Sequence, residues 1–286
     1  MIIWLASYPK SGNTFLRSLL SSYLLTQDGN FKLNALKQIK QFPSISLFKK
    51  FGIDTANDLE LVKNYINVQQ KINLLDKNNI RFLKTHSSLN EINGYQFTDL
   101  NNTLGVIYVV RDPRTVVKSY ANHHQMSLKL ATEKLFEFST LTELTEHSHK
   151  TEDRRITHVG SWASNYDTWK HFKKTNRYLL VKYENLVANT EKTFTEILNF
   201  IYKLSKSKLL IDEKKLKNSI KSTTFAEMQK IEEKEGFPEA VKNIEGKSIA
   251  FFKYGPKKND KNSLPEDLKI KIEKNLKKEL EELEYY

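Results

Sequence analysis

The sequence predicts an α/β protein in which a central parallel sheet is flanked by helices. Short apolar runs of strand length recur at residues 2–6, 80–86, 105–110 and 178–182. Between them lie longer segments in which apolar residues have helical spacing. The chain has 286 residues, which suits one large α/β domain or two small ones and is ample for a substantial core.

The first strand leads into a turn and a helix that together form a candidate anion site. Residues 2–6 predict a buried strand, residues 7–12 a tight turn of small residues, and the spacing from Asn13 onward a helix. The N–H groups at a helix start and the positive end of its dipole favour an anion. Lys10 adds a mobile cation. Hydrogen-bond donors come from the side chains of Ser11, Asn13 and Thr14.

Two other readings of this turn are weaker. An ordinary turn with a solvated lysine is possible, but Lys, Ser, Gly and Thr within five residues favour phosphate binding. A Walker A loop requires Gly-x-x-x-x-Gly-Lys-Ser/Thr, whereas Lys10 precedes Gly12 and no glycine stands upstream. No convincing apolar strand ends in an acid, as a magnesium-dependent NTPase needs. A P-loop ATP-dependent kinase is therefore the lesser alternative, and no metal is expected.

The second strand, residues 80–86, ends in polar residues. Its sequence is IRFLKTH, which places Lys84 and His86 at the carboxyl end, where ligands gather in open parallel sheets. Residues two apart on a strand point to the same side, so we expect Lys84 and His86 to share one side. A lone histidine is more often structural than catalytic, and His123 and His124 are rival candidates for a base.

The clearest strand, residues 105–110, is followed by the run Arg-Asp-Pro-Arg. Pro113 suits the first helical position and Asp112 the N-cap. Arg111 lies at the strand end, and Ser119 follows two helical turns later. The planar fork of an arginine donates bidentately to phosphate. The alternative is that Arg111 pairs with Asp112 or with another surface acid.

The rest of the chain is predicted to be largely helical. Residues 126–150 and 160–174 are interpreted as helices, the second with an aromatic stripe that is most simply core. After the fourth strand another helix begins at Tyr183. The polar, lysine-rich segment 231–262 is interpreted as a mobile lid, and a charged amphipathic helix is expected over 264–283.

Composition narrows the classes of function. The net charge of +12 favours anionic ligands, but no familiar DNA- or RNA-binding motif is present. A basic nucleic-acid-binding protein is therefore a second alternative, and no nucleic-acid partner is expected. The chain has no cysteine, so it forms no disulfide and no thiolate metal site. No stretch reaches the ~18 apolar residues that span a bilayer, and we expect a cytoplasmic protein.

Several of these segments resemble, in the same order, those of the sulfotransferase family that uses 3′-phosphoadenosine 5′-phosphosulfate (PAPS). The run YPKSGNT, Tyr8 to Thr14, resembles the family's 5′-phosphosulfate-binding loop. In the family's Lys-Thr-His segment the residue matching His86 is the general base, and the one matching Lys84 contacts the transferring sulfuryl group. Arg111 and Ser119 match the residues that hold the 3′-phosphate.

The resemblance also implies an adenine site. The stretch VKYENL resembles a family segment whose tyrosine, here Tyr183, contacts the nucleotide. The run STTFAEM resembles the family's Thr-Ser-Phe-x-x-Met segment near the adenine and places Thr223 and Phe225 there. Phe225 and Phe15 would sandwich the purine, since aromatic faces stack on bases. Phe15 stands where the family usually has tryptophan, and either ring could instead be core.

The family's Arg-Lys-Gly clamp on the 3′-phosphate has an imperfect match. Lys253 aligns with its arginine and Gly255 with its glycine, but Tyr254 replaces its lysine. Lys257 and Lys258 would compensate for that replacement.

The resemblance covers almost the whole chain and implies a single sulfotransferase domain, residues 1–286, with a P-loop NTPase-like fold. Three strand ends separately supply cationic or hydrogen-bonding side chains, as a ligand with two phosphate groups requires. The implied reaction moves a sulfuryl group from PAPS to an acceptor hydroxyl or amine. His86 takes the proton, and Lys10 and Lys84 stabilise negative charge. The loop that holds the 5′-phosphate comprises Lys10, Ser11, Gly12, Asn13 and Thr14. The acceptor is expected to be a small molecule or a carbohydrate, but the sequence does not identify it. The oligomeric state is also not identified.

Overall fold

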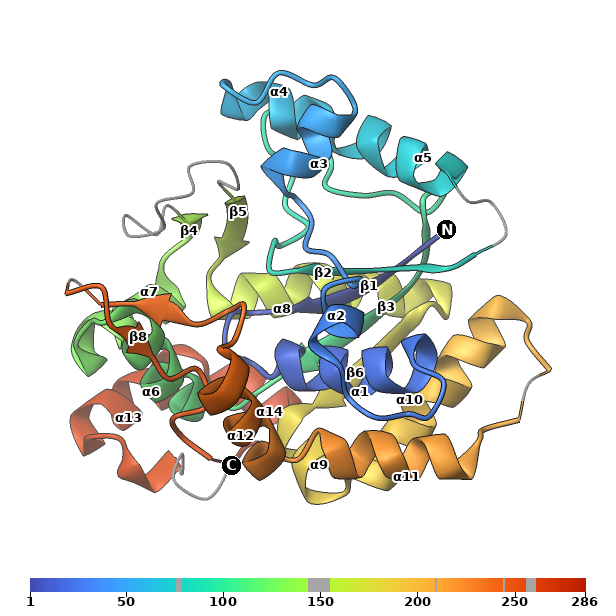
Figure 1. Cartoon of the computed structure of the whole chain (residues 1–286). Helices are drawn as coiled ribbons and strands as arrows, with labels where there is room; N and C mark the ends of the chain where they lie inside the picture. Colours follow the sequence, from blue (N-terminus) through green and yellow to red (C-terminus); the bar gives the residue numbers. More distant parts are fainter. Residues whose placement is uncertain (76–78, 144–154, 209, 244, 256–260) are drawn as a thin grey trace.

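A four-stranded parallel sheet of order β2-β1-β3-β6 lies at the centre of the molecule (Figure 1). The structure, a computed structural model, describes residues 1–75, 79–143, 155–208, 210–243, 245–255 and 261–286. The strands of the sheet are β1 (Ile2–Ser7), β2 (Arg81–Thr85), β3 (Thr103–Val110) and β6 (Tyr178–Lys182). Each apolar run that predicts a strand forms one, and the predicted α/β class with a central parallel sheet is confirmed.

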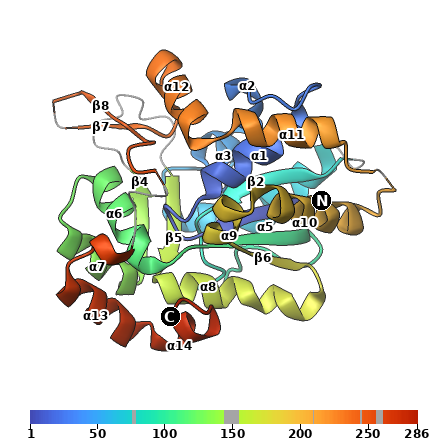
Figure 2. The same ribbon diagram turned by 90° about the horizontal axis from the view of Figure 1, so that it is seen from below.

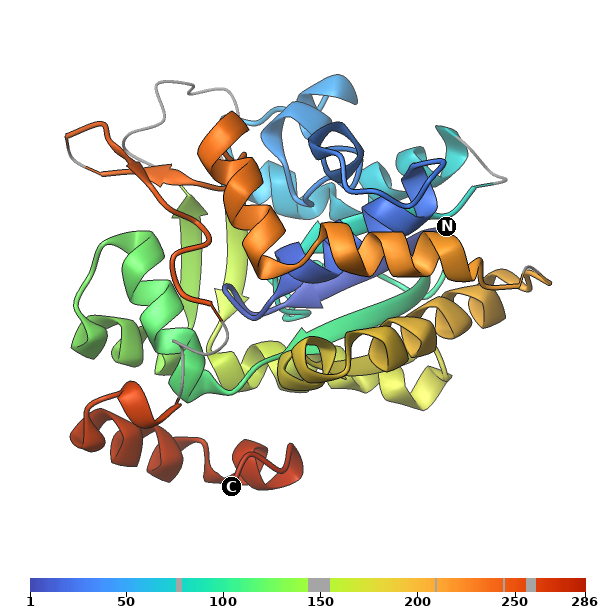
Figure 3. The ribbon, with the colours of Figure 1, turned by 60° about the horizontal axis from the view of Figure 1, so that its bottom comes forward.

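Helices cover both faces of this sheet (Figures 2 and 3). One face packs against α1 (Asn13–Leu25), α10 (Thr190–Ser205) and α11 (Glu213–Ser222). The other packs against α8 (Trp162–Lys170). Other helices contribute to the same core, among them α6 (Pro113–His124), α7 (Leu128–Phe136), α13 (Glu266–Asn275) and α14 (Lys277–Glu282).

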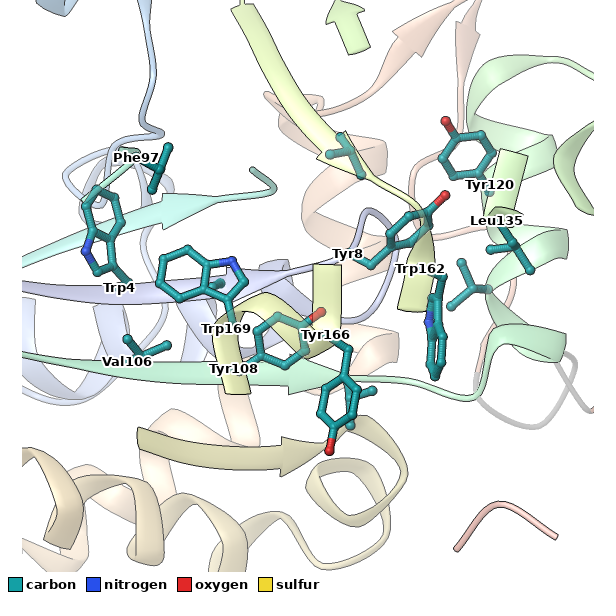
Figure 4. Close-up of a cluster of buried hydrophobic side chains, with 14 of the residues drawn as sticks. Trp4, Tyr8, Phe97, Val106, Tyr108, Tyr120, Leu135, Trp162, Tyr166 and Trp169 are labelled. Carbon is teal, nitrogen blue, oxygen red and sulfur yellow. The ribbon is translucent and has the colours of Figure 1, made fainter. Parts of the chain in front are cut away.

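Alternate residues of the central strands enter the two cores. On β1 the side chain of Trp4 enters one core and that of Leu5 the other, as the period of two along a strand requires. Figure 4 shows the first of these cores, where the ring centroid of Trp4 lies 6.2 Å from that of Trp169 on α8. Because both faces of the sheet are covered, the strands have near-continuous apolar sequences, which is why they are easy to find in the sequence.

The remaining elements are short. Between β1 and β2 lie α2 (Leu33–Leu36), α3 (Ile45–Lys50), α4 (Asp58–Lys63) and α5 (Tyr65–Leu75). After β6 come α9 (Tyr183–Ala188), α12 (Phe225–Glu235), β7 (Val241–Lys242) and β8 (Ser248–Ile249). Two 3₁₀ turns are η2 (His171–Thr175) and η3 (Lys261–Ser263).

The helix expected over residues 126–150 is confirmed only in its first part, over Leu128–Phe136, and is wrong from Ser139 to Glu143, while residues 144–150 lie outside the described residues. Helix α7 ends at Phe136, and β4 (Ser139–Glu143) pairs antiparallel with β5 (Arg155–Gly160). The sequence STLTE of β4 contains two β-branched threonines, which favour a strand over a helix.

Two other helix boundaries also differ from expectation. Gly160 ends β5 with a φ of +71°, and the Ser161 hydroxyl accepts a hydrogen bond from the Ser164 N–H at 3.0 Å, so α8 begins at Trp162 rather than at residue 160. The helix expected over 264–283 is divided at Leu276 into α13 and α14.

Asn165 of α8 joins three segments below the site. Its buried Nδ2 donates to the carbonyl oxygens of His86 at 2.9 Å and Val159 at 2.8 Å, and its Oδ1 accepts from the Tyr108 hydroxyl at 2.7 Å. A buried group that loses its partner costs about 1–3 kcal/mol. We therefore expect Asn165→Ala to lower the free energy of unfolding by at least about 2 kcal/mol, measured by urea denaturation.

The control for this prediction is Asn275→Ala. The Asn275 side chain is exposed and donates to the Lys271 carbonyl within its own helix. Its loss should therefore change the free energy of unfolding by less than about 0.5 kcal/mol. Equal effects at Asn165 and Asn275 would contradict a role for the buried network.

Candidate functional site

The four parallel strands bring the predicted site residues to one edge of the sheet. The turn that starts at Tyr8 follows β1, His86 follows β2, Arg111 follows β3, and Tyr183 follows β6. Carboxyl ends of parallel strands form the ligand-binding edge of open α/β sheets. Segments far apart in the sequence are therefore close to one another at this edge.

The turn after β1 has the conformation of an anion-binding loop. Lys10 and Gly12 both have positive φ angles, +64° and +101°, and curled turns of this kind present backbone N–H groups to a concave surface. Gly12 is the N-cap of α1, and no side chain caps the helix. A Cβ at Gly12 would lie 2.2 Å from Cδ2 of Tyr183, so only glycine allows this close approach.

The polar side chains of the turn divide into two groups. Asn13 holds the turn to β1, because its Nδ2 donates to the Leu5 carbonyl at 2.8 Å and the Ser7 hydroxyl at 3.2 Å. The Ser11 hydroxyl is buried and has no hydrogen-bond partner among the described residues. A buried hydroxyl without a partner costs free energy, and a polar ligand in the turn would satisfy it.

An anion already occupies this region, and it belongs to the chain itself. The Glu239 carboxylate, between α12 and β7, accepts hydrogen bonds from Thr14 Oγ1 at 2.5 Å and Lys84 Nζ at 3.1 Å, and it forms an ion pair with Arg17. Burial alone would raise the pKa of Glu239, but the charges of Lys84 and Arg17 hold it well below its usual range. We call Thr14, Arg17 and Lys84 the anion cradle.

Sequence reasoning missed two members of this arrangement. Arg17 follows Thr14 by three residues and so lies on the same face of α1, a spacing that could have identified it. Glu239 lies more than two hundred residues from Thr14, and no local pattern marks it.

The segment that carries Glu239 also covers Lys10. The Lys10 ammonium lies 3.9 Å from the ring centroid of Phe251, which follows β8. Phe251 and Phe252 pack against Phe237 and, with Met228 of α12, form a small separate core. The segment 231–262, expected to be a lid, begins as the end of α12 and continues as the β7–β8 pair, while residues 244 and 256–260 lie outside the described residues.

His86 is held in one tautomer. Its Nδ1 lies 2.7 Å from the Ser7 carbonyl oxygen and 3.2 Å from the Ser7 hydroxyl. A carbonyl oxygen only accepts hydrogen bonds, so Nδ1 carries the hydrogen and Nε2 carries the lone pair. Burial, and then the charge of Lys84, lower the pKa of His86 to about 3, so the ring is neutral at pH 7.

The rival histidines on α6 are also close to the site. Burial, and then the charge of Lys10, lower the pKa of His123 to about 2 and that of His124 to about 4. The ring of His123 contacts that of Phe251, and the ring of His124 contacts that of Tyr120. A neutral ring therefore does not distinguish His86 from these two, whereas its carbonyl-anchored tautomer favours it as a base.

Arg111 connects the first strand end with the last. Its Nη1 donates to the Lys10 carbonyl at 3.1 Å, its Nε donates to Thr115 Oγ1 at 2.9 Å, and its guanidinium lies 4.3 Å from the ring centroid of Tyr183. The helix that starts after Arg111, α6, also carries Ser119. The turn after β1 and Arg111, the residue predicted to bind the 3′-phosphate, are thus in direct contact.

The predicted clamp residues lie near α6 and Phe225. Lys253 Nζ donates to Asn122 Oδ1 at 3.0 Å, one helical turn beyond Ser119. A Cβ at Gly255 would lie 3.3 Å from the ring of Phe225. Lys257 and Lys258 lie outside the described residues.

The other predicted adenine-site residues make intramolecular contacts. The Thr223 hydroxyl is buried and donates to the Ser219 carbonyl at 2.7 Å. Phe15 packs against the core beneath α1, and the ring centroid of Phe225 lies 5.9 Å from that of Phe252. Stacking of an adenine between Phe15 and Phe225 stays a prediction.

A family model described as the sulfotransferase domain matches residues 2–284. The chain belongs to the sulfotransferase family. This match confirms the resemblance found in the sequence and the class of enzyme that it implies, a PAPS-dependent sulfotransferase.

Individual relatives agree with this sulfotransferase assignment. The luciferin sulfotransferase of Photinus pyralis is 25% identical over 288 residues, which cover 97% of this chain and 71% of that protein. Retinol dehydratase in complex with retinol and PAP (3′-phosphoadenosine 5′-phosphate) has a TM-score of 0.57 at 17% identity, over 98% of this chain and 81% of that one. Its complex with androsterone and inactive cofactor PAP has a TM-score of 0.56 at 16% identity, over 98% and 80%. The two structures support the fold.

None of the described helices combines the length and the apolar character that a membrane crossing requires. In the same part of the chain, no three His, Cys, Asp or Glu side chains gather where they could hold a metal ion.

The lowered pKa of His86 has a consequence for acid stability. An unfolded histidine titrates near 6.5, so the unfolded state binds more protons than the folded state between pH 6.5 and about 3. Acid therefore favours unfolding in this range, by up to ~1.4 kcal/mol per pH unit from this residue. We expect the free energy of unfolding to fall less steeply for His86→Gln than for the wild type between pH 6.5 and 4, measured by urea titration. Parallel curves would mean that folding does not perturb His86.

Proposed function

We propose that this sulfotransferase moves the sulfuryl group of PAPS to a hydroxyl, or an amine, of a small-molecule or carbohydrate acceptor, with His86 as the general base. The observation that carries the proposal is the anion cradle. Thr14, Arg17 and Lys84 hold a carboxylate at the start of α1, where the sequence predicts the 5′-phosphosulfate. A site that binds a carboxylate of the chain itself is also suited to the phosphosulfate group of PAPS.

The relatives support the choice of substrates. The two retinol dehydratase structures contain PAP, one together with retinol and one with androsterone. The relative from Photinus pyralis is named for luciferin. PAP is what PAPS becomes when its sulfuryl group is lost, and it differs from adenosine 5′-phosphate by the 3′-phosphate that we assign to Arg111 and Ser119.

The residues of the site suggest how the transfer proceeds. The acceptor oxygen attacks sulfur in line with the bond to the 5′-phosphate, and its proton passes to Nε2 of His86. The new S–O bond forms as the old one breaks, and the electron pair of the old bond leaves with the phosphate. Lys10 and Lys84 stabilise the negative charge that develops on the phosphate and on the transferring group.

Binding of the donor changes the charges that surround His86. Without a ligand the pKa of His86 is about 3, lowered by burial and by the charges of Lys84 and Lys10, and a base works best when its pKa lies near the operating pH. A phosphosulfate beside Lys10 and Lys84 brings negative charge next to these cations. It therefore counteracts the lowering of the His86 pKa by the two lysines, as the Glu239 carboxylate does when no donor is bound.

A direct experiment separates this function from its alternatives. Calorimetry should detect binding of PAP. It should not detect binding of magnesium ATP, which a P-loop kinase would show, or salt-sensitive binding of an oligonucleotide, which a nucleic-acid-binding protein would show. A screen of acceptors with sulfur-labelled PAPS then identifies the acceptor. Binding of ATP or of the oligonucleotide in preference to PAP would reject the proposal.

The role of His86 is tested by His86→Ala. General base catalysis contributes roughly 10²–10⁴-fold, so turnover with labelled PAPS should fall by that factor while the dissociation constant of PAP changes little. His171→Ala, which removes an exposed histidine at the end of α8, is the matched control and should keep full turnover. Unchanged turnover in His86→Ala would reject His86 as the base.

The carboxylate of Glu239 should compete with the donor. Because it holds the same cations that we assign to the phosphosulfate, Glu239→Gln should tighten binding of PAP by roughly tenfold, or about 1.4 kcal/mol, measured by calorimetry. Glu245→Gln makes the same change of charge on an exposed residue paired with Lys247 and should leave PAP affinity unchanged. Weaker binding in Glu239→Gln would instead mean that Glu239 remains in place beside the nucleotide.

A further inference from the structure

Tyr285, which follows α14, reaches the nucleotide side of the molecule although no motif marks it. Its side chain is buried, and its hydroxyl donates to Oε2 of Glu184 at 3.0 Å. Glu184 immediately follows Tyr183 in α9. The helices that precede Tyr285, α13 and α14, lie side by side with α6 and α8 in the same core (Figures 2 and 3).

The second oxygen of Glu184 extends this contact to the other side of the site. Glu184 Oε1 accepts a hydrogen bond from the backbone N–H of Asp112 at 3.0 Å, and Asp112 immediately follows Arg111. The Glu184 carboxylate therefore links the segment that follows Arg111 to the segment that follows Tyr183. The Arg111 guanidinium lies 4.3 Å from the ring centroid of Tyr183. The separation of this pair depends on where Glu184 is held.

A buried ion pair closes the arrangement into a ring. Asp112 caps α6 by accepting from the Arg114 N–H at 2.9 Å, and its carboxylate pairs with the Arg114 guanidinium at 2.6 Å. The same guanidinium, which is only 2% exposed, donates to the Tyr285 carbonyl and pairs with Glu273 of α13. Charges buried to this degree are tolerated only with all their partners in place, so the ring fixes the first turn of α6.

We propose that Tyr285 is a positioning residue for the 3′-phosphate: through Glu184 and Asp112 it sets the placement of Arg111 against Tyr183. The inference rests on the proposed function, in which Arg111 and Ser119 hold that phosphate. The anion cradle belongs to α1 and β2 and does not include this ring. Loss of the Tyr285 hydroxyl therefore weakens recognition of the 3′-phosphate and leaves recognition of the 5′-phosphate intact.

The test compares two nucleotides that differ only in the 3′-phosphate. Calorimetry on the full chain gives the dissociation constants of PAP and of adenosine 5′-phosphate. The ratio of the constant for adenosine 5′-phosphate to that for PAP measures the 3′-phosphate contribution. Tyr285→Phe removes one oxygen atom and should weaken binding of PAP roughly five- to tenfold, with adenosine 5′-phosphate within twofold of the wild type. A loss of folded protein would weaken both nucleotides equally and leave the ratio unchanged.

Matched variants sharpen the result. Tyr286→Phe makes the same change at the adjacent residue, whose exposed hydroxyl donates only weakly to the Glu273 carbonyl at 3.4 Å, and should preserve the ratio. Glu184→Gln should reduce the ratio as Tyr285→Phe does, and the double variant should add little because both act through one connection. Arg111→Ala is the positive control and should remove most of the 3′-phosphate contribution.

The outcomes separate the inference from the function beneath it. A ratio within twofold of the wild type in both Tyr285→Phe and Glu184→Gln would overturn the positioning role while leaving the proposed function intact. A wild-type protein that binds PAP no better than adenosine 5′-phosphate would overturn the proposed function and the inference with it. A smaller ratio in Tyr285→Phe and in Glu184→Gln, with an unchanged ratio in Tyr286→Phe, supports the positioning role and the proposed function.

Discussion

Parallel pairing of four strands is the constraint on which the site depends. Each strand ends at the same edge of the sheet, so the residue that follows it arrives there whatever its position in the sequence. The contact of Arg111 with the Lys10 carbonyl and with the Tyr183 ring is a direct product of this geometry. Gly12 allows the contact to form, since any larger residue would push Tyr183 away.

The second constraint is charge. Lys10, Arg17, Lys84 and Arg111 gather near one turn, and cations this close together and partly buried destabilise a fold unless anions accompany them. Among the described residues, the Glu239 carboxylate pairs with Arg17 and Lys84, and burial lowers the pKa of His86 so that this ring adds no further positive charge. The donor that we propose, with its two phosphate groups, has the opposite sign of charge to this excess.

Local chemistry explains how far the sequence could predict this protein. The four strands are apolar because both of their faces are buried, and the turn after β1 needs small residues and glycine, so both leave strong local signals. The β4 strand was missed because it lacks the apolar run that marks the strands of the central sheet, and its two threonines are only a weak signal for a strand. Glu239 and Tyr285 were missed for a related reason: each acts only through contacts with residues more than one hundred positions away, and a single sequence does not encode such distances in any local pattern.

One segment supplies both the carboxylate in the cradle and the phenyl ring over Lys10. Glu239 and Phe251 flank the β7–β8 pair and are connected through the packing of Phe237 against Phe251 and Phe252, so withdrawal of one favours withdrawal of the other. A donor that displaces Glu239, as we propose, therefore also uncovers Lys10, which we expect to stabilise the charge that develops when the second substrate reacts with the donor. The consequence is kinetic: the two substrates should add in sequence, with the nucleotide first.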